Sequence, residues 1–108
     1  MNTRDKARYK LRAEMFKALA HPLRIFMLEK LREKPWCVCE LAVEVGIEKS
    51  IASKHLSQLK NVGLIEDEKR GTLVEYRLVA PCILEMAECA EATVLDKRKK
   101  HLELLQAT

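Results

Sequence analysis

Four cysteines are the residues of this 108-residue chain whose spacing most directly suggests chemistry. Cys37 and Cys39 are separated by one residue, and Cys82 and Cys89 lie seven positions apart near the end of the chain. No apolar run resembles a secretory signal, so we expect a cytoplasmic protein whose thiols stay reduced. Reduced thiolates bind soft metal ions or react with oxidants. A free cysteine also serves as a small buried hydrophobe, and that interpretation stays open for any one of the four.

The position of Cys37 relative to a helix decides whether it can bind an ion together with Cys39. Two residues turn about 200° in an α-helix, which would aim the two sulfurs at opposite sides. Chelation therefore requires Cys37 to lie at or before the first helical turn, and Pro35 makes a boundary there plausible. The free amides and the helix dipole at such a position also favour the thiolate form.

Cys82 and Cys89 would share one face of a helix, about 10 Å apart along its axis at 1.5 Å per residue. They cannot easily share one ion or form a disulfide, which needs Cα atoms within roughly 7 Å. We therefore expect a site made of Cys37, Cys39 and one of this pair, Cys82 first, from the same subunit or its partner. Three thiolates fit arsenite, antimonite or lead, and four fit cadmium or zinc. Arsenite and antimonite are the favoured ligands.

Residues 50–60 form the second chemically informative stretch, an amphipathic helix by their pattern. Ala52, Leu56 and Leu59 recur at helical spacing and can face a core. The opposite face carries short polar groups and lysines, which suit the floor of a DNA major groove and its flanking phosphates. With the preceding residues 40–47, which contain the end of a short helix and a turn at Gly46, the pattern predicts a helix-turn-helix. Its outward residues are Lys49, Ser50, Ser53, Lys54, His55, Ser57 and Gln58.

Alternating residues within 64–79 predict two strands around a turn at residues 69–72. A hairpin directly after a helix-turn-helix is a wing. Lys69, Arg70 and Arg77 could lay this wing along the phosphates of a flanking groove, although charged hairpin tips are usually only solvated.

The remaining segments predict three more helices and complete a mostly α fold, a winged helix-turn-helix that fills residues 1–108 as one domain. These three helices cover residues 1–17, residues 22–34, and about 20 to 25 residues beyond Pro81. The first helix of the helix-turn-helix is expected in residues 36–46. The last helix has an apolar stripe that so small a domain cannot cover, and pairing with a second copy would give a C2 dimer. We expect both terminal helices to form this homodimer.

The composition of the chain limits the classes of function that it can have. The net charge of +4 and the pI of about 8.9 are compatible with nucleic acid as a partner but do not require it. With three glycines, no phosphate-binding loop and no clustered acid and base, the chain does not look like an enzyme. No apolar stretch approaches the length of a membrane span.

Three motifs resemble the ArsR/SmtB-type family of winged-helix metalloregulators: Ala20-His-Pro-Leu-Arg24, Cys37-Val-Cys-Glu-Leu41 and Ser53-Lys-His-Leu56. The similarity covers about residues 13–80. It implies a homodimeric repressor that holds double-stranded operator DNA until an inducer binds. Cys-Val-Cys-Glu-Leu is similar to the family's metal-box signature. The family reads DNA through positions that match Lys49, Ser50, Ile51, Ser53, Lys54 and His55.

Two residues depart from the family pattern. Glu48 stands where a neutral capping residue is common, and Ile51 stands where threonine often occurs. We therefore expect a base preference that differs from that of relatives.

The sequence thus predicts a repressor that releases its operator when its cysteines bind a thiophilic metal or metalloid. One alternative keeps this fold but senses oxidants or reactive sulfur through disulfide or polysulfide bridges. A second alternative, from another class, is a winged-helix module whose basic face docks protein rather than DNA.

Overall fold

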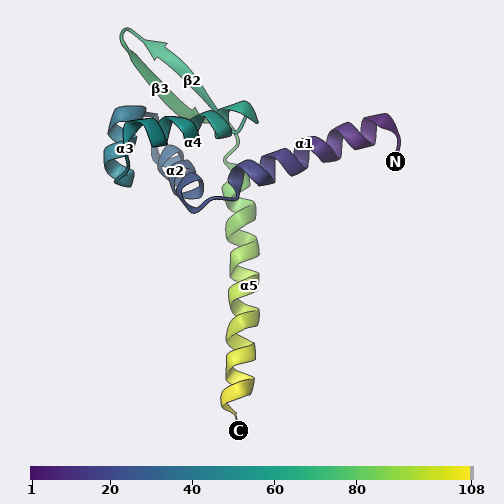
Figure 1. The fold of residues 1–108 in the computed structure, drawn as a ribbon. Coiled ribbons are helices and arrows are strands. Elements are labelled where there is room, and N and C mark those ends of the chain that lie inside the picture. The colour runs from purple at the N-terminus through teal and green to yellow at the C-terminus, as the bar shows by residue number, and fades with distance from the viewer. Residues whose placement is uncertain (108) are drawn as a thin grey trace.

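The computed structural model describes residues 1–107, which form a small body with two projecting helices (Figure 1). The predicted winged helix-turn-helix fold is confirmed. In chain order, the elements of the described residues are α1 (Thr3–Leu19), α2 (Pro22–Glu33), β1 (Trp36–Cys37), α3 (Val38–Val45), α4 (Lys49–Asn61), β2 (Ile65–Arg70), β3 (Leu73–Leu78) and α5 (Cys82–Gln106).

Local signals explain where most helices begin and end. The side chain of Asn2 accepts a hydrogen bond from the Asp5 amide at the start of α1. His21 caps α2 in the same way, ahead of a proline in the first turn. Gly46 ends α3 with φ of +82°, a left-handed conformation that costs glycine little. These boundaries fix the short turn between α3 and α4.

The strand β1 is the one element that the sequence analysis missed. Trp36 and Cys37 were expected to begin the third helix, but they pair with β3, opposite Tyr76 and Glu75. The sheet is antiparallel with the order β1-β3-β2. Two residues are too few to show an alternating pattern. The Trp36 indole also donates to the Lys30 carbonyl at 2.9 Å, which holds this strand beside α2.

The apolar face of α4 lies at the centre of the core, as its spacing predicts. Ala52, Leu56 and Leu59 are each fully buried. They belong to one cluster with residues of α2, α3, β2 and the start of α5. Burying one leucine of this kind contributes about 1.5 to 3 kcal/mol, so this face anchors α4 and leaves its other face to solvent.

The two terminal helices bury little of their apolar surface within the protomer. At the start of α5, Ile83 and Leu84 are buried, and Glu88 pairs with Arg32 of α2 at 2.6 Å. From residue 88 onward the described part of α5 is exposed. Large apolar residues stay exposed on both helices, namely Tyr9, Leu11, Phe16, Met86, Val94, Leu95, Leu102, Leu104 and Leu105. Among residues 1–107, no helix combines the length and apolarity needed to cross a bilayer.

Candidate nucleic-acid interface and cysteine site

The outer face of α4 presents the predicted DNA-contacting residues to solvent. Lys49, Ser50 and Lys54 are exposed, and Ile51 is 40% exposed. Ser53 is half-buried near the middle of the helix. This face borders an open cavity whose lining residues are Arg24, Ile51, Ser53, Lys54, His55, Ser57 and Gln58. The sequence pattern therefore placed most of this surface correctly, and the DNA contacts themselves stay predictions.

His55 differs from the outward-pointing residue that we expected. It is half-buried, and its Nδ1 accepts a hydrogen bond from Arg24 Nε at 3.1 Å. Because Nδ1 is the acceptor, the neutral imidazole must carry its hydrogen on Nε2. The ring of His21 lies 4.5 Å from the His55 ring, centroid to centroid. Burial lowers the pKa of His55, and the nearby His21 and Arg24 lower it further.

Arg24 is a residue that the sequence analysis did not single out. Besides its bond to His55, its guanidinium donates to the carbonyl oxygen of Ala18 at 3.1 Å. One side chain therefore joins the end of α1, the start of α2 and the middle of α4. Arg24 and His55 are 31 positions apart, so helical periodicity cannot reveal their contact. The only sequence signal was the presence of Arg24 in the family-like motif.

The start of α4 has no side-chain cap. Glu48 occupies the N-cap position, and its carboxylate accepts no capping hydrogen bond. Its backbone carbonyl accepts from the Ala52 amide, which begins the helix. The side chain of Glu48 thus makes no capping bond to the first-turn amides. Its negative charge lies at the same end of the helix and would repel a phosphate that approached these amides.

The wing is less basic than its three cations suggest. Lys69, Arg70 and Arg77 share residues 65–78 with Glu66, Asp67, Glu68 and Glu75, so three minus four gives a net charge of −1. The arginines are occupied within the wing. Arg70 pairs with Glu75 at 3.1 Å and Glu68 at 3.7 Å, and Arg77 pairs with Glu66. The predicted phosphate contacts of Arg70 and Arg77 therefore require these pairs to loosen.

Cys37 and Cys39 lie at the boundary that chelation requires. Cys37 is half-buried at the N-cap of α3, with extended backbone angles of −80° and 155°, and Cys39 is exposed in the first turn. Because Cys37 lies outside the regular helix, the 200° separation of two helical residues does not apply to this pair. Cys37 follows Trp36, the single tryptophan of the chain.

Cys82 and Cys89 lie on α5, and both are exposed. Figure 1 shows α3 and the start of α5 apart, with α2 between them. Among residues 1–107 of one protomer, no three His, Cys, Asp or Glu side chains are grouped to hold a metal ion. Within these described residues, Cys37 and Cys39 at the start of α3 therefore belong to no such group with Cys82 or Cys89 of α5.

Sequence comparison places these features in a known family. The profile of the bacterial regulatory protein, arsR family, matches residues 21–67. The HTH-type transcriptional regulator Rv0081 of Mycobacterium tuberculosis is 42% identical over 103 residues, which cover 92% of this chain and 90% of that one. The arsenic resistance transcriptional regulator ArsR1 of Pseudomonas putida is 40% identical over 65 residues, 59% of this chain and 51% of that one.

Solved structures agree with the sequence comparison. The crystal structure of Rv0081 superposes with a TM-score of 0.73 and 37% identity, over 87% of this chain and 95% of that one. The homodimeric winged helix-turn-helix DNA-binding domain of Mb0332 from Mycobacterium bovis has a TM-score of 0.75 and 29% identity, covering 94% and 93%. The relatives are transcriptional regulators, which confirms the prediction of a regulator rather than an enzyme. This chain belongs to the ArsR family of winged helix-turn-helix transcriptional regulators.

Proposed function

We propose that the chain is a homodimeric repressor that releases its operator when Cys37 and Cys39 bind a thiophilic metal or metalloid, arsenite first. The single observation that carries the proposal is the place of the two cysteines. They begin α3, the helix that packs directly against the DNA-facing α4. Ligand binding at the two sulfurs would therefore act on α3, which supports the exposed face of α4.

The coupling has a physical route through the core. Leu41 and Ala42 of α3 pack in the same buried cluster as Ala52 and Leu56 of α4. A ligand that pulls on the start of α3 would shift α4 with it, because close-packed interfaces deform little. In a dimer this changes the separation of two α4 helices that must match half-sites about one helical turn apart. A 100-fold loss of affinity requires about 2.7 kcal/mol of coupling, which thiolate coordination can supply.

The homodimer is proposed from the exposed apolar faces of α1 and α5. A second copy would cover these residues, and the similar domain of Mb0332 is homodimeric. Cys82 or Cys89 would then complete the site with Cys37 and Cys39. Because α3 and the start of α5 lie apart in one protomer (Figure 1), we favour a donor from the partner subunit. Three thiolates suit arsenite or antimonite, and the experiment below also tests cadmium, lead and zinc.

The test begins by selecting an operator from random duplexes with the reduced protein. Duplex binding is then measured by fluorescence anisotropy with arsenite, antimonite, cadmium, zinc or lead. We expect arsenite to weaken binding, and we expect Cys39→Ser to abolish that effect while it retains operator affinity. The proposal is wrong if arsenite occupies the protein fully and duplex affinity is unchanged.

Thiol-based sensing of oxidants or reactive sulfur is the second candidate. Exposure of Cys39, Cys82 and Cys89 favours it, since such thiols are accessible to small oxidants. Treatment with a persulfide donor or peroxide separates the two candidates. A covalent sulfur linkage seen by mass spectrometry, together with lost duplex binding and no response to metals, would replace the metal proposal. Duplex binding that is absent or insensitive to salt would instead favour a protein-docking module.

A further inference from the structure

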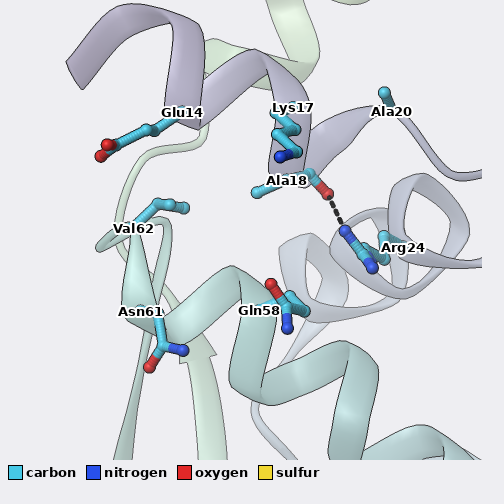
Figure 2. Close-up of a pocket in the computed structure, with 8 residues that line it drawn as sticks. All are labelled: Glu14, Lys17, Ala18, Ala20, Arg24, Gln58, Asn61 and Val62. Carbon is cyan, nitrogen blue, oxygen red and sulfur yellow. Dashed lines mark hydrogen bonds between the residues drawn. The ribbon is translucent and has the colours of Figure 1, made fainter. Parts of the chain in front are cut away.

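An open cavity of about 630 Å³ lies where the end of α1 faces α2 and the C-terminal half of α4. Two cations line it, Lys17 of α1 and Arg24 of α2, together with the amide side chains of Gln58 and Asn61 on α4. Figure 2 shows Arg24 at one side, tied to the Ala18 carbonyl, and Gln58 below Lys17. Glu14 lines the same cavity from α1. The proposed function does not use this site.

This cavity continues the predicted DNA-facing surface. Arg24 and Gln58 line both this cavity and the one along Ile51, Lys54 and His55. Gln58 lies four residues after Lys54, and Asn61 follows Gln58 by three, so all three share one face of α4. The exposed face of α4 therefore runs without a break from its N-terminal turn to the end of α1.

We propose that this cavity binds a backbone phosphate of the duplex, so that Lys17 of α1 belongs to the DNA interface. This inference rests on the proposed function, because it requires α4 to face a duplex. Lys17 supplies a positive charge, and the amide groups of Gln58 and Asn61 can donate hydrogen bonds to the oxyanion. Such a contact positions α4 on the duplex and carries no base information of its own.

Arg24 fits the same site as a positioning residue. A guanidinium has five N–H donors, and the bonds to His55 and Ala18 use two of them. The remaining donors are available to the phosphate while these two bonds fix the guanidinium plane. Glu14 is the opposing feature, since its carboxylate repels a phosphate bound beside Lys17. Removing this charge should therefore strengthen binding.

The test measures how the logarithm of duplex affinity depends on the logarithm of salt concentration. For the full-length protein we expect Lys17→Ala to reduce the magnitude of the slope by about 0.9 per subunit, or about 1.8 for a dimer that loses one phosphate contact in each half-site. Operator and random duplexes should weaken by the same factor. Glu14→Gln should tighten both. Lys10→Ala removes the same charge from an exposed position of α1 outside the cavity, and its slope should equal that of the unsubstituted protein.

The outcomes separate this inference from the proposed function. If Lys17→Ala leaves the slope unchanged while Ser53→Ala weakens operator binding, the phosphate site is wrong and duplex binding through α4 stands. If the unsubstituted protein does not bind duplex, the proposed function itself fails. Titration with inorganic phosphate, followed by ³¹P NMR, tests a free anion as the ligand. Saturable phosphate binding that Lys17→Ala abolishes, without any change in the duplex salt slope, would overturn the inference in favour of a small-anion site.

Discussion

Arg24 Nε lies 3.1 Å from Nδ1 of His55, and this hydrogen bond joins the start of α2 to the middle of α4. The bond fixes the neutral imidazole as the Nε2–H tautomer. We predict that Arg24→Met, which keeps an unbranched apolar stem, populates both tautomers. Long-range ¹⁵N–¹H NMR of the His55 ring measures the tautomers directly. Operator affinity should fall as well, because the donor at Nε2 is no longer fixed and because a cation of the proposed phosphate site is lost.

Arg98→Met is the matched control for this substitution, since Arg98 lies on the exposed part of α5. It should change neither the His55 spectrum nor operator affinity. A His55 ring that keeps the Nε2–H tautomer in Arg24→Met would show that Arg24 does not position it.

The lowered pKa of His55 predicts an acid-sensitive fold. Burial, followed by repulsion from His21 and Arg24, makes protonation harder in the folded protein than at the ordinary value of 6.5. Below that value the unfolded chain binds more protons, so stability falls as pH decreases toward the lower folded pKa. Urea unfolding at about pH 7.5 and about pH 5.5, at fixed protein concentration, measures the loss. It should be smaller in His55→Gln, and equal losses in both proteins would contradict the assignment.

Opposite faces of α4 should respond differently to substitution. Leu56→Ala removes a fully buried side chain and should lower the free energy of unfolding by about 2 to 5 kcal/mol. Ile51→Thr changes an exposed residue, so the free energy of unfolding should stay the same. A selection experiment should instead show that the substituted protein prefers different duplex sequences, because Ile51 belongs to the surface that we propose faces the base edges. An unchanged duplex preference would remove Ile51 from the interface.

The ion pairs of the wing predict that its acidic residues limit DNA binding. Glu75→Gln frees Arg70 from the pair at 3.1 Å and removes one negative charge. Affinity for random duplexes should rise, and the salt slope should steepen toward one additional phosphate contact per subunit, about 1.8 for the dimer. Asp96→Asn makes the same charge change on α5, where Asp96 pairs with Lys100, and should leave the slope unaltered. Equal effects of the two substitutions would indicate net charge rather than the wing.

Features that depend on residues close in sequence could be predicted, because the spacing of apolar residues and the presence of glycine or proline indicate local structure. Leu56 and Leu59 were placed in the core from helical spacing, and the third helix was expected to end at Gly46, where α3 does end. Pro35 made a helix boundary near Cys37 plausible, although the helix itself was expected to begin at Trp36. The hairpin followed from alternation in residues 64–79.

The contacts that the sequence did not reveal all depend on tertiary packing. Trp36 enters a strand only because β3 lies beside it, and two residues leave no period to detect. His55 turns toward Arg24 from a position that spacing alone makes outward. Likewise, the pairing of Arg77 with Glu66 across the hairpin depends on strand register rather than on composition.

The central claim is that occupancy of Cys37 and Cys39 is coupled to release of the duplex by α4. Trp36, the single tryptophan, directly precedes Cys37, so its fluorescence should report ligand binding in the absence of DNA. Titrating the reduced dimer with arsenite should change Trp36 emission and lower operator affinity over the same concentration range. The loss should be about 10- to 100-fold, or about 1.4 to 2.7 kcal/mol of coupling. Both responses should vanish in Cys37→Ser and Cys39→Ser. A Trp36 response that saturates while operator affinity stays constant would contradict the account.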